Sequence, residues 1–342
     1  MKYYNWHSEM YHQLGQRARL PQGLPHALLL KGVAGIGKRA FAGALAQGLL
    51  CEKPVTVLGA CGACEACHWF DTGNHPDFRL LQPEIAEAAA AAAADEGEDE
   101  PAGKEKKKKR DISVAQVRAL RDFINISAHR NGAKVVLIQP AEAMNVNAAN
   151  ALLKSLEEPP PATFFLLVTD RPHLLPATIR SRCQQLALNP PTAQQAAAWL
   201  AQSGASQPEL ALAQAGGSPV LAAELDTEEY WTNRKQFLDG LSARAFDPLV
   251  LAEKFALHPI PQLINWLQRW TYDLACLCFQ QPLRYNPDRR DALMQMAQNG
   301  DGLAVLRFHR ELVRFQRIVN HPLNARLLIE DLLLRYARLP RG

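Results

Sequence analysis

Four cysteines in the first part of the chain have the spacing of a metal site. They follow the pattern C-x9-C-x2-C-x2-C and are Cys51, Cys61, Cys64 and Cys67. Two tight x2 spacings allow four thiolates to surround one tetrahedral ion, which is typical of structural zinc. Buried core cysteines are the plain alternative, but GACGACEACH is too polar and glycine-rich for a core segment. We therefore predict one structural Zn²⁺ with no open position for catalysis. His68 or His75 could replace one ligand, although neighbouring histidines are more often bystanders.

A glycine-rich segment has the spacing of a phosphate-binding loop. A short apolar strand, predicted over 27–30, leads into Gly32, Gly35, Gly37 and Lys38, and a helix is predicted over 39–50. Backbone N–H groups of such a loop wrap a phosphate at the helix N-terminus, and the lysine reaches the outer phosphates. The next residue is Arg39, where a Ser or Thr would hold Mg²⁺. We predict a loop of this fold without a working Mg·ATP site; its plain alternative is an inherited turn whose nucleotide function has lapsed.

The stretch 134–183 supplies the elements that must position these residues. Residues 135–138 form a β-branched run typical of a strand buried on both faces. From Asn147 the apolar residues fall at i, i+3, i+4 and i+7, which predicts a helix that three prolines at 159–161 end. A second buried strand is predicted over 164–168, and two strands joined by a helix make a parallel βαβ unit. The fold class is therefore α/β, and the unit ends in Arg180-Ser181-Arg182-Cys183.

The segment NALLKSLEEPP, followed by a strand and by TIRSRC, resembles the AAA+ clamp-loader subunits of bacterial DNA polymerase III. The resemblance implies an AAA+ P-loop domain with a parallel sheet and an inserted zinc module, a small helical lid domain and an all-α collar domain that oligomerises. It also implies that Arg182, in Ser181-Arg182-Cys183, is an arginine finger for the nucleotide of the adjacent subunit. A guanidinium suits this task because it is always charged and offers bidentate donors to phosphate. The plain alternative for Arg182 is a surface salt bridge.

Three departures from the pattern of the motor subunits argue against ATP hydrolysis by this chain. An ATPase of this class needs carboxylates after the strand 135–138, one for Mg²⁺ and one for the attacking water. Motor subunits have Asp-Glu there, whereas this chain has Gln139 and Pro140, and Glu142 follows two residues later. The arginine of the motor subunits' GSxR motif is replaced by Val220. Together with Arg39, these departures predict a P-loop architecture without its chemistry, and therefore no intrinsic catalysis.

Composition and linkers predict three domains. Residues 84–110 contain an alanine run, DEGEDE and KEKKKKR, without an apolar pattern that could offset the entropy of ordering, so we expect a disordered insertion. Asn189-Pro190-Pro191 is a predicted linker, and the pattern beyond it is helical, with Trp266 and Trp270 expected to share a buried face. The predicted divisions are 1–189 for the P-loop domain, with the zinc module at 51–67, 190–225 for the lid and 226–342 for the collar.

The remaining expectations concern partners and compartment. The net charge of +4 permits a nucleic-acid partner without requiring one. Neither a secretory leader nor a membrane span is expected, which favours the cytoplasm, where thiols stay reduced. The leading hypothesis is a non-hydrolysing clamp-loader subunit whose partners are motor ATPase subunits and delta in a hetero-oligomeric ring, with the sliding clamp and primer-template DNA reached through the complex. The alternatives are an active ATPase in which Glu142 replaces the lost carboxylates, or a zinc-containing DNA-binding module that uses residues 51–67 or the lysine run.

Overall fold

The computed structural model describes residues 3–21, 23–84, 111–126, 128–129, 132–298, 300–318 and 325–339. The chain forms two compact units, Met1–Pro191 and Thr192–Gly342. Nearly all of the predicted insertion at 84–110 lies outside the described residues, so its disorder stays a prediction. The division of the second unit into lid and collar at 225/226 also stays a prediction.

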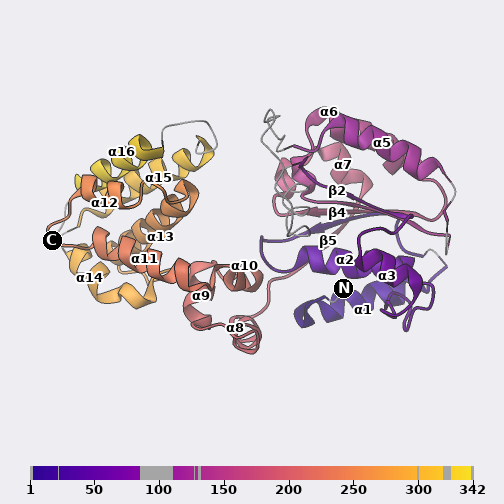
Figure 1. Cartoon of the computed structure of the whole chain (residues 1–342), viewed down its shortest axis with the longest axis horizontal. Coiled ribbons are helices and arrows are strands. Elements are labelled where there is room, and N and C mark those ends of the chain that lie inside the picture. Colours follow the sequence, from indigo (N-terminus) through magenta and orange to yellow (C-terminus); the bar gives the residue numbers. More distant parts are fainter. Residues whose placement is uncertain are drawn as a thin grey trace, which may run out of the picture. The chain divides into compact units, whose positions relative to one another are not determined.

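A five-stranded parallel sheet forms the centre of the N-terminal unit (Figure 1). Its order is β2-β3-β4-β1-β5, and all four neighbouring pairs are parallel. The predicted α/β class is thus confirmed. The strands are β1 (Ala27–Lys31), β2 (Phe78–Leu81), β3 (Lys134–Ile138), β4 (Thr163–Thr169) and β5 (Gln184–Ala187). The last of them was not predicted, because two of the four residues of β5 are glutamines.

Helices cover both faces of the sheet (Figure 1). On one face, Leu28 and Leu30 of β1 belong to an apolar cluster with Phe41 and Leu45. On the other face, Leu29 of β1 belongs to a second cluster with residues of the following helices. The first face carries α1 (Ser8–Ala18), α2 (Lys38–Leu50) and α3 (Glu65–Asp71), and the second carries α5 (Val114–Asn125), α6 (Val146–Glu157) and α7 (Ala177–Arg182).

Side chains at the helix starts explain where α5 and α6 begin. Ser113 accepts a hydrogen bond from the backbone N–H of Gln116, and the Gln116 side chain accepts one from the backbone of Ser113, which makes a capping box. Asn145 caps α6 by accepting from the N–H of Ala148 at 2.8 Å. The start of α6 lies within one residue of the predicted position at Asn147. Three short 3₁₀ turns occupy connections: η1 (Asn5–His7), η2 (Ala141–Ala143) and η3 (Pro172–Leu174).

Every described regular element of the C-terminal unit is a helix. A small apolar cluster around Leu200 joins the first three helices, and a larger one surrounds Trp266 and Trp270. These two tryptophans are 1% and 0% exposed, so their predicted shared burial is confirmed. The helices are α8 (Ala193–Gln202), α9 (Pro208–Gln214), α10 (Pro219–Leu225), α11 (Glu228–Leu241), α12 (Pro248–Lys254), α13 (Ile260–Cys278), η4 (Pro287–Arg289), α14 (Arg290–Gln298), α15 (Gly302–Ile318) and α16 (Ala325–Ala337).

A buried polar network joins these two clusters. The Gln214 amide of α9 donates to Asn286 Oδ1 at 3.3 Å, and its oxygen accepts from the Tyr230 hydroxyl at 3.3 Å. Asp273, which is fully buried, accepts from the backbone N–H and the side-chain amide of Asn286. Arg234 donates to Asn286 as well and pairs with an aspartate of η4. Because buried polar groups are costly to leave unpaired, this network fixes α9 against the larger helical cluster.

Two helical glycines provide a matched test of the packing between α2 and the cysteine-containing segment. A Cβ at Gly48 would lie 1.8 Å from the backbone oxygen of Leu58, whereas a Cβ at Gly15 would have no heavy atom within 4 Å. We expect Gly48→Ala to destabilise the protein by about 1–3 kcal/mol through this overlap. Gly15→Ala should stabilise it by up to about 1 kcal/mol through helix propensity. Thermal unfolding of the two variants checks both signs, and an unchanged melting temperature for Gly48→Ala would contradict this packing.

Candidate phosphate loop, metal centre and surface arginine

The glycine-rich loop connects the end of β1 to the start of α2 at the carboxyl edge of the sheet. Gly37 has φ of 94° and Gly35 has φ of 72°, a backbone region that favours glycine. Gly32 is required by a close approach, because a Cβ there would lie 2.6 Å from the backbone oxygen of Leu188. The predicted loop therefore forms, and its glycines are explained by the chain's own conformation and packing.

The charge of Lys38 is balanced inside the protein. Its side chain is only 3% exposed, and Nζ lies 2.5 Å from Oδ1 of Asp170, the residue after β4. The same ammonium donates a hydrogen bond to the backbone oxygen of Val33. A buried ammonium needs such partners, since desolvation without them is costly. A nucleotide phosphate at this loop would have to compete with Asp170 for the lysine.

An aromatic pair near the N-terminus packs on the same loop. The rings of Tyr4 and Trp6 stack with centroids 4.7 Å apart, and Trp6 Nε1 donates to the backbone oxygen of Ile36 at 3.0 Å. The Tyr4 ring lies so near Gly37 that a Cβ there would be 2.2 Å from it. The sequence gave no sign of this contact, because its partners are far apart in the chain.

His7 adds no charge beside the loop. The residue is 2% exposed, and its ring meets that of Phe41 edge-on at 5.7 Å. Burial lowers the pKa of His7 to about 4, and the positive charge of Lys38 acts in the same direction. The imidazole is therefore neutral at neutral pH, so it adds no second cation beside Lys38.

The residues after β3 do not supply the carboxylates of a hydrolytic site. Gln139 and Pro140 follow the strand, and the Gln139 side-chain oxygen is buried with no hydrogen-bond partner. Glu142 lies in η2, and its Oε1 accepts from the backbone N–H of Asp170 at 3.2 Å. Arg39 is exposed. The structure thus brings Glu142 into contact with Asp170, which the sequence did not predict, and leaves no acidic residue at the two expected positions.

Arg182 lies at the surface at the end of α7. Its Nε donates to Glu157 Oε1 of α6 at 2.6 Å, and Nη1 donates to the backbone oxygen of Thr178 at 3.1 Å. The side chains of Arg182 and Glu157 are 33% and 46% exposed. In the isolated chain, therefore, Arg182 takes part in a surface ion pair. Val220, the third departure, belongs to α10 of the C-terminal unit.

The four predicted cysteines converge. The Sγ atoms of Cys51, Cys61, Cys64 and Cys67 all lie within 4.8 Å of one another. The Cys51–Cys64 and Cys61–Cys67 sulfur pairs are 3.9 and 4.0 Å apart, close to the separation of about 3.8 Å for thiolates 2.3 Å from a tetrahedral ion. The donor set is therefore arranged as a metal-binding cluster. His68 and His75 are not part of it, and His75 Nδ1 accepts from the backbone N–H of Asp77.

Backbone N–H groups favour the thiolate form of Cys61 in this cluster. The N–H groups of Ala63 and Cys64 both point at the sulfur of Cys61, at 3.5 and 3.3 Å. These hydrogen bonds lower the pKa of the Cys61 thiol. Cys64 in turn caps α3 through the N–H of Cys67. Both tight spacings thus serve the cluster, because each brings a backbone donor to a sulfur.

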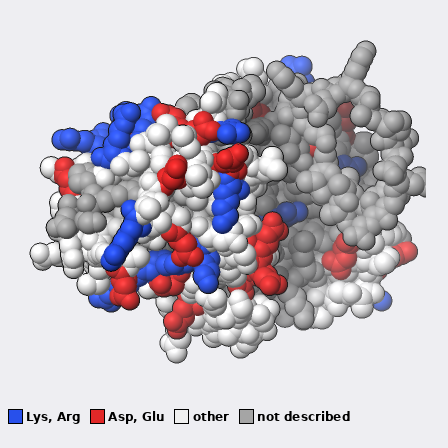
Figure 2. All heavy atoms as spheres, turned by 60° about the vertical axis from the view of Figure 1, so that its left-hand side comes forward, with Lys and Arg blue, Asp and Glu red and all other residues white. Residues whose placement is uncertain are grey.

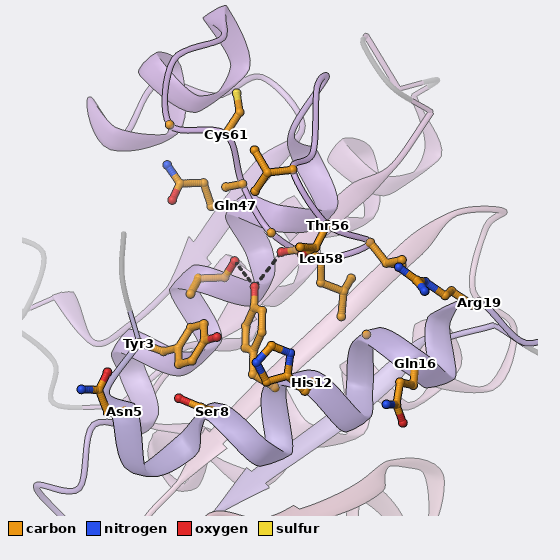
Figure 3. Close-up of a pocket in the computed structure, with 18 residues that line it drawn as sticks. Tyr3, Asn5, Ser8, His12, Gln16, Arg19, Gln47, Thr56, Leu58 and Cys61 are labelled. Atoms are coloured by element: carbon orange, nitrogen blue, oxygen red, sulfur yellow. Dashed lines mark hydrogen bonds between the residues drawn. The ribbon is translucent and has the colours of Figure 1, made fainter.

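An open cavity of about 760 Å³ lies between α1 and the segment 55–62, which contains Cys61 (Figure 3). Tyr3, Ser8, His12, Gln16 and Arg19 line its α1 side. Beside it, the buried Tyr11 hydroxyl meets the backbone oxygens of Ala44 at 3.0 Å and Leu58 at 2.7 Å, shown as dashed lines. Burial raises the pKa of Tyr11, so the hydroxyl stays protonated and ties α1, α2 and this segment together.

No helix in the described part of the chain is long and apolar enough to cross a membrane.

Comparisons with known proteins agree over both units. The family model described as "DNA polymerase III, delta subunit" matches residues 6–192, and "DNA polymerase III, delta subunit, C terminal" matches residues 228–338. DNA polymerase III subunit delta' of Pseudomonas aeruginosa is 38% identical over 352 residues, covering 98% of each chain. The Escherichia coli subunit of the same name is 31% identical over 345 residues, covering 98% of this chain and 95% of that one. DNA polymerase III subunit tau of Escherichia coli is 34% identical over 163 residues, covering 48% of this chain and 21% of tau.

Proposed function

Since the chain belongs to the family of DNA polymerase III delta' subunits, we propose that it is a non-hydrolysing subunit of the clamp loader. In this role it assists ATP-dependent loading of the sliding clamp on primed DNA in the cytoplasm. Its partners are the motor ATPase subunits and delta in a hetero-oligomeric ring, and it reaches clamp and primer-template DNA through that ring.

The contact between Lys38 and Asp170 is the observation that best supports the non-hydrolysing role. In a phosphate loop, the lysine balances the charge of the outer phosphates. Here the lysine already pairs with the carboxylate of Asp170, at 2.5 Å. The loop also has an exposed arginine at position 39 where Mg²⁺ would need a hydroxyl. The loop keeps the shape of a phosphate loop, but the carboxylates expected after β3 are absent and Lys38 is already paired.

One observation favours the rival hypothesis of an active ATPase. Glu142 and Asp170 are in contact, and Asp170 reaches the loop lysine, so two carboxylates lie near the place where Mg²⁺ would bind. For hydrolysis, Asp170 would have to leave Lys38, and Glu142 would have to leave the Asp170 N–H. We therefore keep this function as the second candidate, to be separated by experiment.

We expect the isolated chain to show no ATP turnover above background. Lys38→Ala and Glu142→Gln should leave that background unchanged, because neither residue acts on a bound nucleotide. Steady-state phosphate release with Mg·ATP measures this. Turnover that both substitutions abolish would establish the rival hypothesis instead.

We also propose that the cysteine cluster holds one structural Zn²⁺. Four sulfur donors with tetrahedral separations suit zinc, and a fully protein-bound ion has no open position for substrate. The ion would join the end of α2, the loop after it and α3 through Cys51, Cys61 and the Cys64–Cys67 pair.

Cys64→Ser should release the metal and lower the melting temperature of the protein, because a structural zinc site contributes folding energy directly. Metal analysis of freshly purified protein, with thermal unfolding, measures both effects. Cys276→Ser is the matched control, since Cys276 lies in α13 outside the cluster and should leave the metal content unchanged. Freshly purified wild-type protein without zinc would refute the proposal.

Arg182 is the residue that we propose to act on a neighbouring subunit. It is partly exposed, and its ion pair with Glu157 is of the surface kind, worth about 0–1 kcal/mol. Little free energy would therefore be lost if the guanidinium turned from Glu157 to a phosphate of an adjacent nucleotide. An arginine finger in other P-loop systems contributes on the order of 10³-fold or more at its own site.

Arg182→Ala should leave this chain's folding, metal content and assembly intact, yet lower the DNA- and clamp-stimulated ATPase of the reconstituted loader. The loss in the whole complex should be smaller than at one site, because other interfaces still hydrolyse ATP. Glu157→Gln is the sharpest control: it breaks the same ion pair but keeps the arginine, so stimulated activity should persist. Arg180→Ala, in the same helix, should have the weaker effect.

Two results would contradict this role of Arg182. An assembled loader that carries Arg182→Ala and keeps full stimulated ATPase and clamp loading would make the chain a scaffold only. Equal losses with Arg182→Ala and Glu157→Gln would assign the effect to the ion pair and not to a finger.

A further inference from the structure

Helix α15 of the C-terminal unit presents a stripe of arginines. Arg307, Arg310 and Arg314 follow one another at steps of three and four residues, so they lie on one face, and all three are exposed. The opposite face is buried through Val305, Phe308 and Leu312, which fixes the orientation of the helix. In the sequence, Arg317 continues the same spacing.

These three arginines have no ion-pair partner among the described residues, whereas several other arginines of the unit do. Arg326 pairs with Glu330, Arg335 with Asp331 and Glu311, and Arg289 with Asp239. Glu311 is the only acidic residue of α15, and it is 3.3 Å from Arg335. In the coloured part of Figure 2, blue and red side chains are interspersed. The stripe on α15 is therefore positive charge that the described part of the chain leaves uncompensated.

We infer that this stripe binds the phosphate backbone of single-stranded DNA. Arg307 and Arg314 are about 10 Å apart along the helix axis, so their flexible side chains and that of Arg310 can reach neighbouring phosphates of one strand. Each guanidinium can bind a phosphate through two donors. The exposed Leu306 and Val313 beside the stripe give sugars and base faces an apolar surface, at 38% and 42% exposure. This assigns a DNA contact to the chain itself, whereas the proposed function reaches DNA only through the complex.

The basic residues of the stripe are all arginines, and the one acidic residue of α15 is already paired. This composition favours a phosphate polyanion as the ligand, since bidentate guanidinium contacts suit phosphate geometry. A folded acidic protein surface is the competing partner, and the apolar residues of the face would suit it too. The two partners differ in salt dependence and in their effect on assembly. An experiment that follows both separates them.

The test compares two full-length variants with the same loss of charge. In one, Arg307, Arg310 and Arg314 are all replaced by Gln; in the other, the paired Arg289, Arg326 and Arg335 are replaced by Gln. Fluorescence anisotropy with a labelled single-stranded oligonucleotide is recorded over a range of salt concentrations. The α15 variant should bind about 10-fold more weakly at low salt or worse, and its logarithmic salt slope should fall by about 2, as expected for three lost phosphate contacts. The paired-arginine variant should stay close to wild type.

A third variant accounts for the lysine run. In it, Lys106, Lys107, Lys108 and Lys109 are replaced by Gln. With these replacements present, the salt slope should still differ between a protein with the three α15 arginines and one without them. If that replacement removes all DNA binding while the α15 variant binds like wild type, the inference is overturned. Wild-type protein that does not bind the oligonucleotide even at low salt overturns it too.

Folding and assembly are followed in the same samples by thermal unfolding and by size-exclusion chromatography with the partner subunits. An α15 variant that folds and assembles yet binds DNA weakly supports the inference. A variant that no longer assembles while its DNA affinity is unchanged assigns the stripe to a protein partner and overturns it. Failure of wild-type protein to assemble would count against the proposed function and would leave the DNA result to stand by itself.

Discussion

The parallel pairing of β1 with β4 is the constraint on which the N-terminal unit depends. Lys31 lies opposite Thr169 in this register, so the phosphate loop after β1 and Asp170 after β4 leave the sheet side by side. The register of β3 with β4 brings the segment with Glu142 to the same edge. Because carboxyl ends of parallel strands meet at one edge, residues far apart in sequence form one cluster there. In that cluster the loop lysine, Lys38, contacts Asp170, and Asp170 in turn contacts Glu142.

The glycines of the loop are required by the fold itself. Gly37 is held by a left-handed backbone and by the Tyr4 ring, and Gly32 by the backbone of Leu188. Lys38 is held by Asp170. Each residue that marks a phosphate loop in the sequence therefore has a second, purely structural reason to be present. A sequence match to the loop is evidence for the fold, and evidence for hydrolysis has to come from the groups that touch Mg²⁺ and water.

Sequence patterns predicted the parts of the structure whose cause is local. The cysteine cluster followed from tight spacing, and the buried strands β1, β3 and β4 from apolar runs. Strand β5 was not predicted because it lies at the edge of the sheet. An edge strand can form without apolar alternation, and of its four residues only Leu186 is buried. The Lys38–Asp170 pair and the contact of Tyr4 with Gly37 were not predicted for another reason. Each joins segments that are far apart in the sequence and meet only in the folded unit. The carboxylate losses were predicted, but the nearness of Glu142 to Asp170 was not.

The position of Arg182 follows from the same sheet. Helix α7 lies between β4 and β5 in the chain and is anchored by Ile179, which is fully buried, so its last residue is carried to the surface. Glu157 then holds the guanidinium by an ion pair that solvent weakens, and an arginine stays charged whether or not that pair forms. Lys38 is thus buried and paired with Asp170, whereas Arg182 is held only by a solvent-exposed ion pair with Glu157. A phosphate that approaches from outside can compete for Arg182 more easily than for Lys38, because only the arginine contact is exposed to solvent.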